Sequence, residues 1–154
     1  MKQKKEIVTI TNYQKLAMRT CLKQCRNSEY AHFGSLSEFY ELQSKLYGYK
    51  AKKVRGDPEK KLVEVEKAIL DEVGDCFWFI ALKCEIGKVS FEKIYKAKAK
   101  VLEGLEAQLK NDIEALKSCC KSWETAPITC LKANIEKLAS RAERGVIQGN
   151  GDDR

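Results

Sequence analysis

Apolar residues recur at intervals of three and four along most of the chain, which is the spacing of one face of an α-helix. This pattern predicts a first helix from Thr11 to about Cys25 and a second from about Ser35 to Tyr47. The third predicted helix is the clearest and runs from Pro58 to about Cys84. Its expected buried stripe consists of Ile69, Val73, Cys76, Ile80 and Cys84.

The second half of the chain continues the helical pattern. A long charged helix is expected from about Glu92 to Ser118, and a last helix from Ile128 to Arg144, ahead of a glycine-rich tail. No segment has the alternating pattern of a strand. We therefore expect an all-α fold, a bundle of four or five helices in a single domain over residues 1–154. Residues 92–133 are expected to form an extended helical hairpin.

Composition and charge narrow the class of protein. The chain has 154 residues, a net charge of +7 and no run of 18 apolar residues, so no membrane span is expected. A basic balance is compatible with nucleic acid or with a small phosphate-bearing ligand. Seven cysteines, an odd number, without an export signal indicate reduced thiols and a cytoplasmic location.

Two pairs of acidic residues are the strongest candidates for a functional site. Glu38 and Glu41 are three residues apart on the second predicted helix, and Glu72 and Asp75 have the same spacing on the third. This spacing places both carboxylates of a pair on one helix face, and two antiparallel helices can bring the pairs together. Carboxylates ~5 Å apart repel by roughly 3 kcal/mol per pair at an effective dielectric near 20.

Such a cluster persists only when it is protonated or holds cations. Oxygen ligands with no histidine nearby favour Mg²⁺, with Mn²⁺ as a substitute. The alternative is that both pairs belong to solvated helix faces. Asp75 favours a site, because it follows Gly74 and precedes a strongly apolar segment in which an acid needs a partner.

These residues resemble a known family, the MazG-type nucleotide pyrophosphohydrolases of the all-α NTP pyrophosphatase superfamily. The resemblance covers residues 10–90 and 132–154, and it is closest to small single-domain bacterial and phage members. On the third predicted helix it rests on Asp71, Glu72, Val73, Gly74, Asp75, Trp78 and Phe79. At the C-terminus it rests on Asn134, Lys137, Arg141, Arg144, Gly149, Gly151 and Arg154.

The resemblance implies Mg²⁺-dependent hydrolysis of nucleoside or deoxynucleoside triphosphates to the monophosphate and pyrophosphate, in the control of nucleotide pools. The residues implied as catalytic metal ligands are Glu38, Glu41, Glu72 and Asp75. Those implied to bind substrate are Asn134, Lys137, Arg141, Arg144 and Arg154. Trp78 could stack on a base or belong to the core. We also expect a homodimer or a dimer of dimers, because the apolar third helix needs partner surface.

Two features depart from the family. Phe39 and Tyr40 stand between the first two glutamates, where small residues are usual, and the segment 92–131 is longer than usual. These departures leave two alternatives to the enzyme. One is a family member that has lost catalysis and serves as an interaction protein. The other is a basic helical protein that binds nucleic acid, which is the less expected partner.

Overall fold

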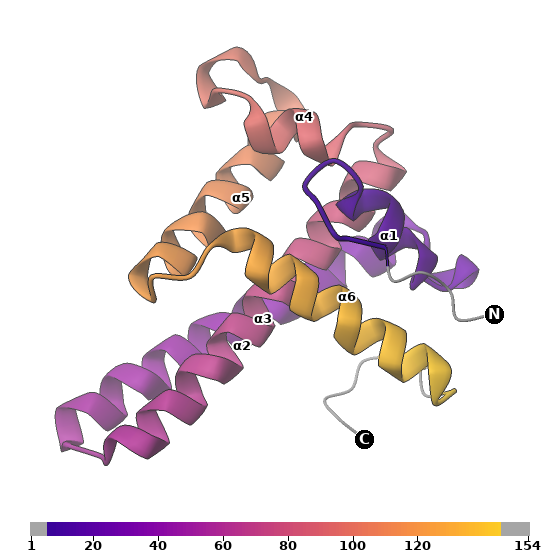
Figure 1. Ribbon diagram of the computed structural model, residues 1–154. Coiled ribbons are helices and arrows are strands. Elements are labelled where there is room, and N and C mark those ends of the chain that lie inside the picture. The colour runs from indigo at the N-terminus through magenta and orange to yellow at the C-terminus, as the bar shows by residue number, and fades with distance from the viewer. Residues whose placement is uncertain (1–5, 146–154) are drawn as a thin grey trace.

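The α3 helix, Glu59–Ile86, is the central element of a computed structural model that describes residues 6–145 (Figure 1). It is joined to α2 by a short turn, and the two helices run side by side in opposite directions. The remaining α-helices pack around its C-terminal half. The α-helices of the described part are α1 (Tyr13–Arg19), α2 (Ser28–Arg55), α3, α4 (Phe91–Lys96), α5 (Gly104–Ser122) and α6 (Pro127–Glu143).

Local sequence signals fix the ends of α2. The Asn27 side chain accepts a hydrogen bond of 2.8 Å from the backbone N–H of Tyr30, which satisfies a free donor of the first turn. At the other end Gly56 adopts φ of +74°, a left-handed conformation that closes a helix at little cost when the residue is glycine. Pro58 then precedes α3 with a φ of −57°, which is compatible with a helix start.

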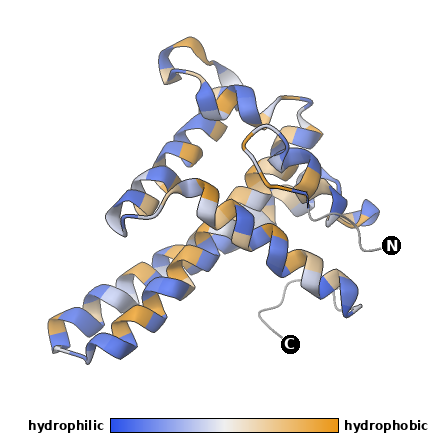
Figure 2. Cartoon of the chain, in the orientation of Figure 1, coloured by the Kyte–Doolittle hydropathy of each residue, from blue (hydrophilic) through white to orange (hydrophobic). Residues whose placement is uncertain are grey.

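The hydrophobic core lies along α3 (Figure 2). The predicted stripe is confirmed, because Ile69, Val73 and the three stripe residues that follow are fully buried. Helices α1, α2, α5 and α6 all pack on α3. The apolar third helix is therefore covered by its own chain. The described part is all-α and contains no strand, as expected, and none of its helices is both long and apolar enough to cross a membrane.

The first two predicted helices have different bounds from those expected. The first ends at Arg19 and is followed by a separate 3₁₀ turn, Lys23–Cys25. The second begins earlier and runs through Gly48 to Arg55. Gly48 does not end the helix after Tyr47, because one interior glycine costs only about 1 kcal/mol relative to alanine and the 28-residue helix packs on α3.

The prediction of a single long helix over residues 92–118 is wrong. The chain forms the short α4, a 3₁₀ turn at Ala99–Val101 and then α5, which begins at Gly104 with a φ of +55°. The fold thus has more helices than the four or five expected. The α5 helix turns into α6 at residues 123–126, and it packs on α3 through Leu109, Ile113 and Leu116, all of them buried.

Two glycines of α2 give a matched pair of stability predictions. A Cβ at Gly34 would overlap the buried ring of Phe79, whereas a Cβ at Gly48 would meet nothing within 4 Å. We expect Gly34→Ala to lower the free energy of unfolding by about 1–2 kcal/mol, because overpacking outweighs the better helix propensity. Gly48→Ala should raise it by up to about 1 kcal/mol. Urea unfolding followed by circular dichroism measures both, and equal effects of the two substitutions would contradict this account.

Candidate metal centre

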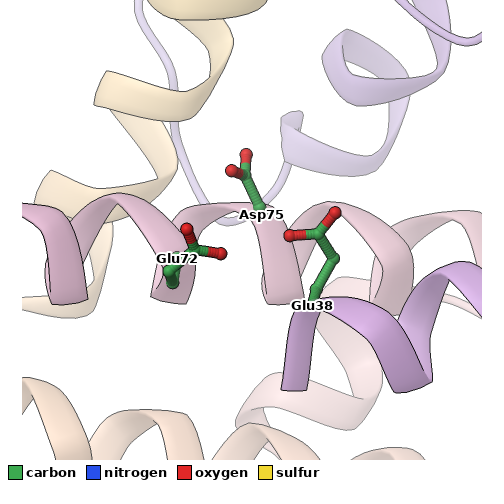
Figure 3. Close-up of side chains that lie close together, drawn as sticks. All are labelled: Glu38, Glu72 and Asp75. Carbon is green, nitrogen blue, oxygen red and sulfur yellow. The ribbon is translucent and has the colours of Figure 1, made fainter. Parts of the chain in front are cut away.

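Three carboxylates from two helices converge between α2 and α3 (Figure 3). They belong to Glu38 on α2 and to Glu72 and Asp75 on α3, and each offers an oxygen within 4.8 Å of the others. The antiparallel packing of the two helices brings them together, as the spacing of the acidic pairs predicted. Three neighbouring carboxylates are a set of hard oxygen ligands, which suits a divalent cation such as Mg²⁺.

Glu72 is the most buried member of this carboxylate cluster. The residue is only 4% exposed, and its Oε1 is in contact with the ammonium group of Lys45 on α2. Within the described residues its Oε2 is buried and has no hydrogen-bond partner. A buried carboxylate oxygen without a donor is costly, so this atom marks a place where a cation would be stabilised.

Asp75 is linked to α6. Its Oδ1 accepts a hydrogen bond of 2.7 Å from Asn134 Nδ2, and Lys137 Nζ lies 2.7 Å from Oδ1 and 2.6 Å from Oδ2. Tyr13 from α1, which is fully buried, donates a hydrogen bond of 3.5 Å to Asn134 Oδ1. Four helices therefore meet at the cluster, and Lys137 neutralises part of its charge.

Gly74 lets α6 come this close. A Cβ on this residue would lie 3.0 Å from the carbonyl oxygen of Cys130 and 3.1 Å from Cβ of Asn134. The first of these neighbours is backbone and cannot rotate away. This close packing of α6 on α3 places Asn134 and Lys137 beside Asp75.

Burial and mutual repulsion shift the pKa values of carboxyl groups in the cluster. Burial raises the pKa of Glu38 to about 8, and the charges of Asp75, Glu72 and Glu41 act in the same direction. Burial also raises the pKa of Asp75, although the charge and hydrogen bonds of Lys137 oppose this shift. Glu38 is therefore the group that carries a proton near neutral pH when no cation is bound.

Glu41, the fourth predicted ligand, is not one of the three converging carboxylates. Its Oε1 accepts a hydrogen bond of 3.4 Å from Ser37 Oγ on the same helix, and its charge contributes to the raised pKa of Glu38. Lys45 is a functional candidate that sequence reasoning missed. It follows Glu38 and Glu41 at i+7 and i+4 on the same face of α2, and this spacing was a usable signal.

The predicted substrate-binding residues fall into two groups. Asn134 and Lys137 contact Asp75 directly, and the charge of Arg141 opposes the rise in the pKa of Asp75, so these three lie toward the cluster. Arg144 is exposed at the end of α6, where its Nε donates a hydrogen bond of 3.4 Å to the Ser140 carbonyl. Arg154 lies outside the described residues.

Three aromatic residues lie close to the acidic residues in the sequence. Trp78 belongs to the core: its Nε1 donates to Thr20 Oγ1 at 3.0 Å and lies 3.3 Å from the Ala17 carbonyl, and 9% of the residue is exposed. The core interpretation of Trp78 is therefore the one that the contacts favour. Phe39 packs against the core, and Tyr40 is 69% exposed.

The raised pKa of Glu38 predicts how stability depends on pH in EDTA. In the unfolded chain this carboxyl titrates near 4.5, and in the folded protein near 8. The folded state holds the proton over this window, so its stabilising effect is complete below pH 4.5 and is lost as pH rises toward 8.

With allowance for partial exposure, the free energy of unfolding should fall by about 2 kcal/mol between about pH 5.5 and 8.5. Urea unfolding at a series of pH values measures the slope of the free energy of unfolding against pH. Glu38→Gln should flatten it, because the amide does not titrate. A slope that is the same in this variant would show that other groups cause the pH dependence.

The donor set as a whole fits a divalent cation. It offers three converging carboxylates, one of them with a buried oxygen that lacks a donor, and Lys45 and Lys137 supply positive charge in the same place. Comparisons of the chain with protein-family models, with curated proteins and with solved structures found no match in any of the three.

Proposed function

We propose that the protein is a Mg²⁺-dependent hydrolase that converts nucleoside or deoxynucleoside triphosphates to the monophosphate and pyrophosphate. The observation that carries this proposal is the convergence of the Glu38, Glu72 and Asp75 carboxylates beside Lys137 and Asn134. An acidic cation site next to a phosphate-binding cation is the arrangement that phosphoryl chemistry needs. The reaction type itself comes from the resemblance of the two acidic pairs and the C-terminal residues.

Each residue has a defined task in this proposal. Glu38, Glu72 and Asp75 would hold the ion, and Glu41, whose charge acts on Glu38, is the fourth ligand that the resemblance implies. A bound Mg²⁺ supplies charge neutralisation at the phosphates and lowers the pKa of a bound water. Asn134 and Lys137 would orient a phosphate group, since their amide and ammonium groups are donors that already point at the cluster.

The direct test incubates the full chain with each common NTP and dNTP, first with Mg²⁺ and then with EDTA. Chromatography resolves the products. Monophosphate and pyrophosphate in equal amounts, formed only with the metal, would support the proposal and rank the bases and sugars. Formation of nucleoside diphosphate and inorganic phosphate would contradict the assigned bond cleavage. No turnover of any nucleotide would contradict the proposed hydrolase activity.

A second candidate function is metal binding without catalysis, in a protein that acts through its partners. One contact favours it: Lys137 approaches both oxygens of Asp75, so an ammonium group already supplies a positive charge to this carboxylate. Isothermal titration with MgCl₂ separates the two candidates. Mg²⁺ binding together with no hydrolysis in the nucleotide assay would favour the second one.

A further inference from the structure

Two buried cysteines meet where α5 turns into α6 (Figure 1). Cys120 lies in the last turn of α5 and Cys130 in the first turn of α6, and their thiols form a hydrogen bond with the sulfur atoms 3.8 Å apart. Cys120 is fully buried, and Cys130 is only 3% exposed. All seven cysteines of the chain are free thiols. Among the described residues, these two are the pair whose sulfur atoms are in contact.

The backbone on both sides of this thiol pair is held in place. The Cys120 carbonyl accepts hydrogen bonds from the backbone N–H groups of Trp123 at 3.1 Å and Thr125 at 3.0 Å. The Cys130 carbonyl lies against Gly74 of α3, where a Cβ would be only 3.0 Å away. The fold therefore brings the two thiols together before any bond joins them. Such proximity favours reaction within the pair over reaction with a second molecule.

One thiol of the pair activates the other. A hydrogen bond from the Cys130 thiol lowers the pKa of Cys120, although burial opposes this shift, and the same contact raises the pKa of Cys130. Cys120 is therefore the first of the two to form a thiolate, which is the reactive form of cysteine. Burial raises the pKa of Cys84 to about 12 and that of Cys119 to about 11, so neither of these thiols is activated.

We propose that Cys120 and Cys130 are a redox modification site, at which hydrogen peroxide forms a reversible disulfide between α5 and α6. The Cys120 thiolate attacks one peroxide oxygen and the O–O bond breaks, which leaves a sulfenic acid and a hydroxide that regains the Cys120 proton as water. The Cys130 sulfur then attacks the sulfenic sulfur, the S–O bond breaks, and the hydroxyl leaves with the Cys130 proton as a second water. The two thiols supply the two electrons that reduce the peroxide.

A small oxidant suits a thiol pair that is closed to bulky reagents. Hydrogen peroxide has nearly the size of water. Both cysteines lie within about one helical turn of the connection at residues 123–126, where Glu124 and Ala126 are exposed. Helix ends open locally at a lower cost than the core, so the peroxide reaches the pair without global unfolding. A low-molecular-weight dithiol reverses the bond by thiol–disulfide exchange.

The disulfide would tie α6 to α5 at the turn that packs on Gly74. Asn134, which donates a hydrogen bond of 2.7 Å to Asp75, lies one turn further along α6. The two cysteines are ten positions apart in the chain, and a bond that closes this loop restricts the unfolded chain and so stabilises the fold. The inference uses neither a metal nor hydrolysis, and its failure would leave the proposed function untouched.

Peroxide treatment of the full reduced chain, followed by peptide mapping, tests the assignment. Free thiols are alkylated after the reaction, and the protein is digested with trypsin. Trypsin places Cys130 in the peptide 122–132 and both Cys119 and Cys120 in the peptide 118–121. We expect mass spectrometry to find these two peptides joined by a disulfide that a dithiol removes. The oxidised protein should have two fewer free thiols than the reduced one.

Two variants identify the reacting neighbour. Cys119→Ala leaves Cys120 as the single cysteine of its peptide, and the link to Cys130 should persist. Cys120→Ala should abolish the link while circular dichroism shows unchanged helix content. A link that persists in Cys120→Ala, a disulfide that joins other cysteines, sulfinic acid at Cys120 without a disulfide, or a link that forms only in urea would each overturn the proposal. Mapping of the unsubstituted protein and of Cys119→Ala decides the matter even when Cys120→Ala does not fold.

Thermal unfolding tests the stabilising effect of the disulfide. The oxidised unsubstituted protein should melt about 5–10 °C above the reduced protein, because the closed loop is short and the chain has about 150 residues. Cys119→Ala should show the same gain, Cys120→Ala should show none, and a dithiol should remove the gain. A protein that carries the disulfide and melts no higher than its reduced form would overturn the proposed stabilisation of the fold.

Discussion

Glu72→Gln is expected to lower Mg²⁺-dependent nucleotide hydrolysis by at least about 1,000-fold, since it removes a buried metal ligand and charge at the centre of the site. Lys45 contacts Oε1 of Glu72, but within the described residues the buried Oε2 has no hydrogen-bond partner, so a bound cation would stabilise this oxygen. The substitution keeps the shape of the side chain and replaces one oxygen by a donor. Steady-state rates at saturating Mg²⁺ measure the loss.

Thermal unfolding separates loss of the metal ligand from loss of the fold. In EDTA, Glu72→Gln should melt within a few degrees of the unsubstituted protein, because relief of the repulsion with Asp75 offsets loss of the ion pair with Lys45. With Mg²⁺, the unsubstituted protein should gain stability and the variant should not. A stabilisation by Mg²⁺ that persists in the variant would contradict the assignment of Glu72 as a ligand.

Glu64→Gln is the matched control. Glu64 is exposed on the same helix two turns before Glu72. The substitution makes the same chemical change to α3 and the same change in net charge. It should leave hydrolysis and the Mg²⁺-dependent shift in melting temperature unchanged. An equal loss in both variants would point to the overall charge of the protein and not to the carboxylate cluster.

The sequence was sufficient to place three of the four predicted ligands. Spacing of three residues fixes the relative direction of two side chains on one helix, and a short connection between α2 and α3 requires antiparallel packing. These two rules bring Glu38 to Glu72 and Asp75. They do not fix how far the two helices slide along each other, and this shift decides that Glu38 joins the cluster while Glu41 stays beside it.

Other features depended on contacts between distant segments. Gly48 and Gly104 are the same residue type, yet Gly48 lies inside a helix and Gly104 begins one with a positive φ. Packing of α5 on α3 selects where the second half of the chain bends. The indole of Trp78 is likewise placed by Thr20, 58 positions earlier, which helical periodicity alone does not reveal.

The contacts of the two lysines beside the cluster, Lys45 and Lys137, also depend on packing that the sequence does not show. Lys45 was missed although its spacing from Glu38 and Glu41 was a usable signal, and Lys137 was identified as a phosphate ligand through the family resemblance, without its contact to Asp75. That contact depends on Gly74, which allows α6 to cross α3 closely. It also raises a question that a substitution can answer, namely whether Lys137 serves the carboxylate or the substrate.

Lys137→Met is expected to lower kcat/KM for nucleotide hydrolysis by about 100-fold while it tightens Mg²⁺ binding several-fold. The two effects have opposite signs because the ammonium group competes with the metal at Asp75 but attracts the phosphate groups of the substrate. Methionine keeps most of the apolar stem and removes the charge together with the hydrogen-bond donors. Steady-state kinetics measures the first effect, and isothermal titration with MgCl₂ measures the second.

Lys132→Met provides the comparison, because Lys132 is exposed on the same helix and its loss changes the net charge equally. It should alter neither quantity. If Lys137→Met tightens Mg²⁺ binding and leaves kcat/KM unchanged, Lys137 only balances the charge of Asp75 in the metal-free protein. If Mg²⁺ binding weakens, the ammonium group is needed to hold Asp75 in place, and the cluster requires both the lysine and the ion at once.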